Sequence, residues 1–127
     1  QVEGCDWIRD PGTGVYTPDP RMRNAYRSAA AHFVPQIVPG VEPASLAQGL
    51  FRLSDCGARC HHFGPEGFVG SHDGFGPRVW RVIDLEPDGV RLRDVWEGGA
   101  LLPVPKVDSD QPWCPVPFSP GYGRFGS

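Results

Sequence analysis

The stretch that decides the fold is VWRVIDLEPDGVRLRDVW, residues 79–96. Two runs rich in β-branched and aromatic residues, 79–85 and 90–96, flank the sequence Glu86-Pro87-Asp88-Gly89. Proline suits the second position of a type I turn, and Gly89 stands where a β-bulge needs a left-handed residue. The stretch therefore predicts an antiparallel hairpin at the centre of a small sheet.

This turn also predicts a register and two sheet faces. With Glu86 opposite Val90, Trp80 lies opposite Trp96 and Ile83 lies opposite Arg93. One predicted face carries large apolar residues, namely Trp80, Val82, Val90, Leu92 and Trp96. The other mixes apolar residues with the arginines Arg81, Arg91 and Arg93. We expect the tryptophan face to pack on the core, and the mixed face to be covered by the tail, by arginine stems or by a partner.

A helix is predicted on the N-terminal side of this hairpin. Asp19 is a favourable N-cap residue, and Pro20 suits the first helical position. Apolar residues then recur at helical spacing until Val34-Pro35, at Met22, Ala25, Tyr26, Ala29 and Phe33. Three basic residues, Arg21, Arg23 and Arg27, are expected on a solvated face. Residues 45–54 are predicted to form a short helix that runs into a strand.

Glycine and proline together make up about a quarter of the 127 residues, with 17 Gly and 15 Pro. This is about twice their usual share. The excess lies in the two ends of the chain and in a glycine-rich loop at 64–76. We therefore predict an α+β fold with one domain over 1–127, divided into an N-terminal arm (1–18), a core of one amphipathic helix packed on a short antiparallel sheet (19–97) and a Pro-rich C-terminal arm (98–127).

Composition and charge argue against several classes of protein. The 14 aromatic residues and a normal apolar content favour a globular chain over a disordered one. A net charge of −3 provides no basic surface for a phosphate backbone, so general nucleic-acid binding is not expected. Apolar runs are too short for a membrane span. A chain that begins at Gln1 without a leader is typical of a mature protein whose signal peptide has been removed.

The four cysteines, Cys5, Cys56, Cys60 and Cys114, predict disulfides that hold the arms. A nested pairing, Cys5 with Cys114 and Cys56 with Cys60, ties the two arms together and closes a short central loop. Crossed pairings between the central and terminal cysteines stay open as alternatives. All of these pairings require an oxidising compartment, so we expect a secreted or otherwise extracytoplasmic protein.

The segment from Cys56 to His61 resembles the c-type haem attachment motif, in which two thiols bind the porphyrin and the next histidine ligates iron. Three residues separate the cysteines here, where the motif has two. The resemblance implies haem at Cys56, Cys60 and His61. Zinc is a second alternative, held by Cys56 and Cys60 with His61 or His62 and with His72, because thiolates and imidazoles are common zinc ligands. The favoured expectation is no cofactor.

Acid–base groups gather between Asp55 and Asp73, and the catalytic candidates are His61, His62, Glu66 and His72. Imidazoles that titrate near neutral pH beside a carboxylate suit general acid–base hydrolysis without a metal. This residue set is similar to that of small, disulfide-linked secreted ribonucleases. It predicts, as an alternative function, a secreted hydrolase that acts on phosphodiester or glycosidic bonds.

Binding is favoured over catalysis, because the arms and the two-sided hairpin expose more apolar surface than one small core covers. We predict an interaction module, or a subunit of a larger assembly, whose partner is another protein or a second copy of the chain. The expected contact residues are Arg81, Arg91, Arg93, Trp113, Phe118 and Tyr122.

Overall fold

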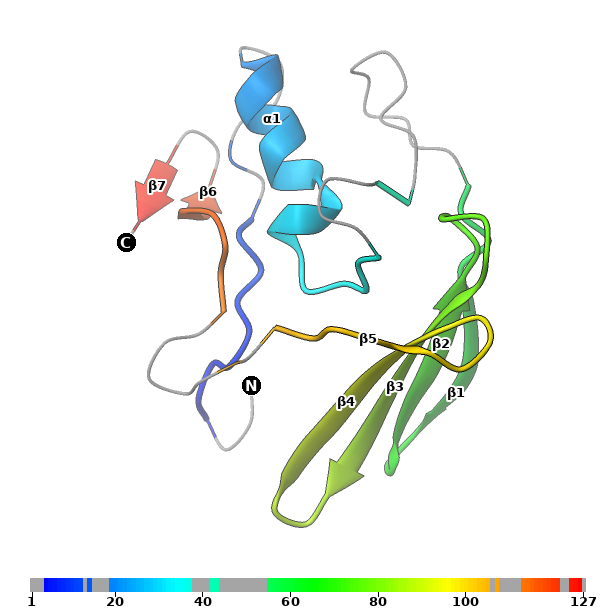
Figure 1. Ribbon diagram of the computed structural model, residues 1–127. Helices are drawn as coiled ribbons and strands as arrows, with labels where there is room; N and C mark the ends of the chain where they lie inside the picture. The colour runs from blue at the N-terminus through cyan, green and yellow to red at the C-terminus, as the bar shows by residue number, and fades with distance from the viewer. Residues whose placement is uncertain are drawn as a thin grey trace. The chain divides into compact units, whose positions relative to one another are not determined.

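A computed structural model of the chain describes residues 4–12, 14, 19–37, 42–43, 55–105, 107, 113–121 and 124–126. The chain divides into two compact units, one formed by 1–34 with 105–127 and the other by 35–104. The first unit contains the helix and the second contains a five-stranded sheet (Figure 1). A helix together with an antiparallel sheet confirms the α+β class. The packing of helix on sheet and the single-domain organisation stay predictions.

The second unit is built on an antiparallel sheet whose strands follow one another in chain order (Figure 1). The strands are β1 (Arg59–Gly64), β2 (Gly67–His72), β3 (Val79–Glu86), β4 (Gly89–Trp96) and β5 (Leu101–Leu102). Short connections join neighbouring strands, as expected for a meander of hairpins. Among the described residues, β1 forms one edge of the sheet and the two-residue β5 forms the other.

The central hairpin is confirmed, but its register differs from the prediction by one residue. Glu86 pairs with Gly89, so that only Pro87 and Asp88 form the turn. Because side chains alternate along a strand, this shift places Trp80 and Trp96 on opposite faces instead of one. The predicted tryptophan face is therefore wrong.

Cross-strand chemistry explains the observed register. Ile83 now lies opposite Leu92, and Leu85 lies opposite Val90, so that apolar residues pair with apolar ones. Arg81 lies directly opposite Asp94. The predicted register would instead have placed arginine against isoleucine. Apolar pairs and pairs of opposite charge across neighbouring strands stabilise a sheet. Here their contribution outweighs the preference of the turn sequence for a β-bulge at Gly89.

Residues 59–72 form the β1–β2 hairpin, so the prediction of a glycine-rich loop at 64–76 is wrong over β2. The glycines permit close backbone contact within the sheet. A Cβ atom at Gly67 would lie 1.9 Å from the carbonyl oxygen of Ile83, and one at Gly70 would lie 2.4 Å from the ring of Phe68. These glycines serve strand packing instead of loop flexibility.

The helix of the first unit, α1 (Pro20–Arg27), begins as predicted. The carboxylate of Asp19 accepts hydrogen bonds from the backbone N–H groups of Arg21 and Met22, both at 3.0 Å. The helix ends earlier than predicted, because Ser28 adopts an extended backbone and its hydroxyl donates to the carbonyl of Ala25 at 2.8 Å. A short 3-10 turn, η1 (Ala29–Ala31), follows. Among the described residues, no helix has the length and apolar character needed to cross a membrane.

Arg23 was expected on a solvated face of the helix, and this prediction is wrong. Its side chain is buried, with 8% of its surface exposed, on the same side of α1 as the buried ring of Tyr26. Positions three apart share a helix face, and the long apolar stem of arginine packs well in such a place. The predicted apolar stripe therefore describes the buried side of α1 only in part.

Residues 7–11 and 113–119 lie side by side within the first unit (Figure 1). Trp113 donates its N–H to the carbonyl of Trp7 and accepts from the N–H of Arg9, and Ser119 donates to the carbonyl of Pro11. The hydroxyl of Tyr26 donates to the carbonyl of Pro117. The last elements form a small hairpin, β6 (Phe118–Gly121) and β7 (Arg124–Gly126). The helix and strand predicted at 45–54 fall outside the described residues.

Candidate functional site

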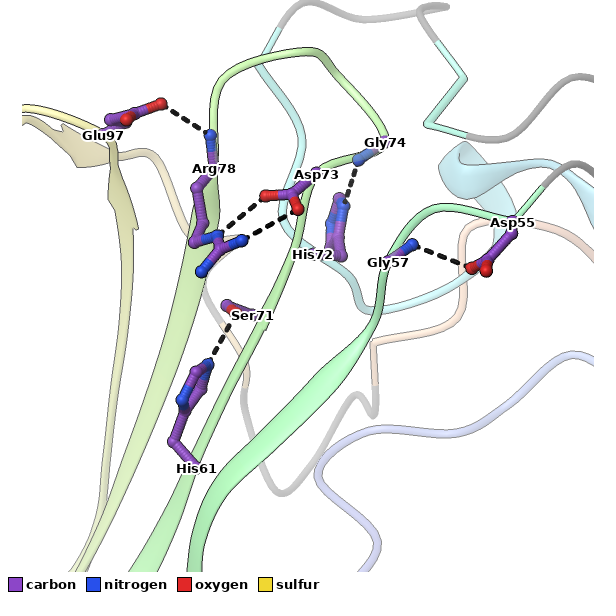
Figure 2. A network of polar contacts seen from close by, with 9 residues as sticks. All are labelled: Asp55, Gly57, His61, Ser71, His72, Asp73, Gly74, Arg78 and Glu97. Atoms are coloured by element: carbon purple, nitrogen blue, oxygen red, sulfur yellow. Dashed lines mark hydrogen bonds and ion pairs between the residues drawn. The ribbon is translucent and has the colours of Figure 1, made fainter.

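The predicted histidine cluster lies on the β1–β2 hairpin. Nε2 of His61 is 2.7 Å from the hydroxyl of Ser71, a residue that is 7% exposed. The His61 ring also stacks on Trp80, with 4.5 Å between ring centroids. Figure 2 shows the His61–Ser71 contact between β1 and β2. His61 is thus held in place by two neighbours of the sheet.

His62 and Glu66 form a separate pair at the exposed end of the same hairpin. Nε2 of His62 is 2.7 Å from a carboxylate oxygen of Glu66, and both side chains are largely exposed. An imidazole beside a carboxylate has the groups required for proton transfer. The structure describes all four catalytic candidates, and only these two are joined to each other by a hydrogen bond or ion pair.

His72 lies on the other face of the sheet from His61, because it follows Ser71 in β2 and successive side chains alternate. Its Nδ1 accepts the backbone N–H of Gly74 at 3.2 Å, so the neutral ring carries its proton on Nε2 (Figure 2). Burial lowers the pKa of His72 against the smaller opposing effect of Asp73. The structure therefore does not bring His72 together with His61.

An ion pair that joins Asp73 to Arg78 lies just beyond the end of β2. Two hydrogen bonds, at 2.7 and 2.9 Å, link the guanidinium to the carboxylate (Figure 2). The hydrogen bond from Arg78 holds the pKa of Asp73 below its usual value, and the same bond raises the pKa of Arg78. Glu97 accepts the backbone N–H of Arg78 at 3.0 Å. This pair closes the loop between β2 and β3.

The three arginines predicted to contact a partner each pair with a carboxylate of the same sheet. Arg81 binds Asp94 through two hydrogen bonds of 2.8 Å. The other two pairs are Arg91 with Glu86 at 2.8 Å and Arg93 with Asp84 at 2.9 Å. This neutralisation weakens the argument for a basic binding patch at Arg81, Arg91 and Arg93. Their contact with a partner stays a prediction.

The aromatic contact residues of the C-terminal segment also have neighbours. The ring of Trp113 packs edge-on against Phe33, with 5.1 Å between centroids. The guanidinium of Arg9 lies 5.2 Å from the ring centroid of Phe118. Tyr122 falls outside the described residues. The two described rings contribute to the first unit, and their role in binding is a prediction as well.

All four cysteines are free thiols in the structure. Cys5 and Cys114 belong to the first unit, whereas Cys56 and Cys60 belong to the second. The thiol of Cys60 donates to the carbonyl of His62 at 3.6 Å, and that of Cys114 donates to the carbonyl of Val116 at 3.2 Å. The structure does not show the predicted disulfides, and they stay a prediction. In the part of the chain that the structure describes, no three His, Cys, Asp or Glu side chains are grouped for a metal ion.

One end of the sheet displays apolar side chains that sequence reasoning did not identify as a site. By the observed register they share the face that carries His72, and we call them the apolar end: Phe63, Phe68, Ile83, Leu85, Val90 and Leu92. Phe63 is 84% exposed, Leu85 52% and Val90 46%. Finding this group required the register, because its members come from all four long strands.

No protein-family model, curated protein or solved structure matches this chain.

Proposed function

We propose that this protein is an interaction module that associates with a second copy of itself through strand β1 and the adjoining apolar end of the sheet. The observation that carries the proposal is Phe63, an aromatic side chain that is 84% exposed on the edge strand of a face that also exposes Leu85 and Val90. Single exposed apolar residues are ordinary, whereas a contiguous exposed group marks an interaction site.

The open edge of the sheet supports this proposal. From Arg59 to Phe63 every residue of β1 is exposed, and among the described residues β1 pairs with β2 alone. An exposed edge strand offers unpaired backbone groups to another strand. The apolar end alone is small for a stable interface, which usually buries about 1,600 Å² in total. Backbone pairing along β1 supplies the additional contacts.

Charge supports a second copy as the partner. Arg59 stands at the start of β1, and Glu66 follows just beyond its end. When two copies of β1 pair in antiparallel fashion, Arg59 of each copy approaches Glu66 of the other. The same arrangement places Phe63 of each copy near the centre of the contact, opposite His62 of the other copy, which removes its ring from water.

Sedimentation velocity tests this proposal over concentrations from micromolar to sub-millimolar. We expect a concentration-dependent dimer that Phe63→Ser abolishes. Leu101→Ser is the matched control, because Leu101 is 70% exposed but lies on β5 at the other edge. A chain that is monomeric at every concentration, or a dimer that both variants weaken equally, contradicts the proposal.

The proposed setting is an oxidising, extracytoplasmic compartment in which the nested disulfides form. Backbone hydrogen bonds join residues 7–9 to Trp113, close in sequence to Cys5 and Cys114. Each proposed bridge therefore joins cysteines of one unit, whereas crossed bridges would join the two units. A covalent link between two segments that already pair stabilises mainly by restricting the unfolded chain.

A secreted hydrolase is the second candidate, and the contact between His62 and Glu66 favours it. Both groups are exposed at the end of a hairpin, where a substrate can reach them. A bell-shaped pH profile on RNA, NAD or a polysaccharide, lost in Glu66→Gln, would support this function. Absence of activity on all three excludes it. The same preparation, inspected for a Soret absorption band, tests the haem alternative at Cys56, Cys60 and His61.

A further inference from the structure

The second unit contains a cavity of about 390 Å³ next to the sheet. Its wall is mostly apolar and includes Phe68 from β2, Val79 from β3 and Ala58 from the segment before β1. A cavity of this size and character is suited to a small organic ligand. Ser71 also lines it, although the contact of the Ser71 hydroxyl with His61 lies on the other face of the sheet from His72.

Two of the three basic groups that line the cavity are already neutralised. The third, Arg59, is exposed and pairs with Ser71, so its side chain belongs to the other face of the sheet from His72. Arg81 lines it, but both of its hydrogen bonds to Asp94 are satisfied within the protein, and Asp94 is 1% exposed. His72 also lines it, and burial favours its neutral form. Its Nδ1 is used by Gly74. An uncharged, apolar ligand therefore fits the cavity better than an anion.

The thiols of Cys56 and Cys60 line the same cavity. The backbone of each cysteine is held by a different contact. Cys56 is fixed by its carbonyl, which accepts the backbone N–H of Asp73 at 2.7 Å. Cys60 is fixed by strand pairing with Gly70. A disulfide brings two sulfur atoms to about 2.05 Å and two Cα atoms to about 4.4–6.8 Å. Both thiols are free in the structure, so bridge formation must bring their two sulfur atoms closer together.

We propose that the cavity binds a small, uncharged apolar molecule in the dithiol state, and that a disulfide between Cys56 and Cys60 closes it. The oxidant is a low-molecular-weight disulfide. One cysteine thiolate attacks it and releases a thiol, and the other cysteine attacks the mixed disulfide and releases the second. The protein loses two hydrogens, and the external disulfide is reduced to two thiols. The cavity shares Arg59, Cys60 and Phe68 with the proposed self-association surface, but the binding proposed for it does not require a second copy of the chain.

The test is a fluorescence titration with the neutral apolar dye N-phenyl-1-naphthylamine. The double variant Cys5→Ser/Cys114→Ser leaves only the central pair, and intact mass shows whether oxidised glutathione has formed the bridge. We expect the dye to bind the reduced form at least about tenfold more tightly than the bridged form. Equal affinities of the two forms, or no bridge by mass, overturn the proposal.

Two further variants separate the cavity from general dye binding. Cys56→Ser/Cys60→Ser is expected to keep dye binding and to lose its sensitivity to oxidation. Ala58→Phe places a ring in the cavity and is expected to abolish binding, while circular dichroism checks that the sheet is intact. Undiminished binding in a folded Ala58→Phe variant locates the dye elsewhere and overturns the site. If the cysteine variants do not fold, the dye affinities of the reduced and the oxidised wild-type chain are compared instead. Proteolysis and mass analysis then show which bridges the oxidised chain contains.

Discussion

Arg81 and Asp94 lie directly opposite each other on β3 and β4, joined by two hydrogen bonds of 2.8 Å. The side chain of Asp94 is 1% exposed and that of Arg81 is 15% exposed. Burial of a charge is costly unless it is paired, so this contact makes each residue depend on the other. It also fixes the register of the central hairpin.

Removal of one partner should therefore be strongly destabilising. Asp94→Ala is expected to lower the free energy of unfolding by about 3–5 kcal/mol, because it leaves the guanidinium of Arg81 buried without its carboxylate. Urea denaturation measures this change. The control is Asp84→Ala, which breaks the exposed pair with Arg93 and should cost less than about 1 kcal/mol. Similar losses in the two variants would contradict the special role of the buried pair.

Substitution of two glycines tests the observed hairpins, Gly89 at the turn between β3 and β4 and Gly67 at the start of β2. Gly89 has open space around a Cβ atom and no left-handed backbone, so Gly89→Ala should be neutral or stabilising by up to about 1 kcal/mol. Gly67 has φ +153 and would place a Cβ atom 1.9 Å from the Ile83 carbonyl oxygen. Gly67→Ala should lower the thermal midpoint clearly. A destabilised Gly89→Ala variant would favour the bulged turn instead.

Stability should decrease in mild acid because of His72. Burial lowers its pKa in the folded chain below the unfolded value of about 6.5. The unfolded chain therefore binds more protons below that pH, and folding becomes less favourable as pH falls. His72→Asn keeps an acceptor for Gly74 and should reduce the loss of thermal stability between about pH 7.5 and 5.5. An unchanged pH dependence in this variant would show that other groups control it.

A second acid transition is expected from Asp73. The hydrogen bond from Arg78 lowers its pKa below the usual value of 3.8, so its contribution is complete above that value and is lost as pH falls through the folded pKa. Asp73→Asn should remove this transition and leave the His72 effect in place. Thermal unfolding below about pH 4 makes the comparison. Equal acid sensitivity of the variant and the wild type would rule out this role for Asp73.

The disulfide proposal gives a prediction about mass. Protein from an oxidising compartment should gain two hydrogens for each bridge when it is reduced, and peptide mapping should link Cys5 to Cys114 and Cys56 to Cys60. Each of these pairs lies within one unit of the chain. A peptide that links Cys56 or Cys60 to a terminal cysteine would contradict the nested pairing, and four persistent thiols would contradict the compartment.

Much of the fold could be predicted from local sequence. The alternation in 79–96 and the Asp19-Pro20 cap identify a hairpin and a helix start with a physical reason for each. The register could not be read in the same way, because turn preference and cross-strand pairing disagree by one residue. The β1–β2 hairpin was missed because Gly67 and Gly70 resemble loop residues until their close neighbours are known.

The candidate site was predictable in its residue types and not in its arrangement. His61, His62, Glu66 and His72 are close in sequence, but strand alternation places His72 on the other face from His61. No motif or spacing in the sequence identified Ser71 as the partner of His61 or Asp94 as the partner of Arg81. The correct register would have revealed the pair of Arg81 with Asp94, which face each other. It would not have revealed the pairs of Arg91 and Arg93, because these arginines bind Glu86 and Asp84, which lie diagonally across the hairpin.

The most direct test of self-association through β1 is hydrogen exchange of its backbone amides at low and high protein concentration. Protection within residues 59–64 is expected to rise with concentration, whereas protection in β3, which is paired on both sides, stays constant. The rise should disappear in Phe63→Ser. Exchange in β1 that does not depend on concentration, or a rise confined to another segment, would contradict the proposed contact.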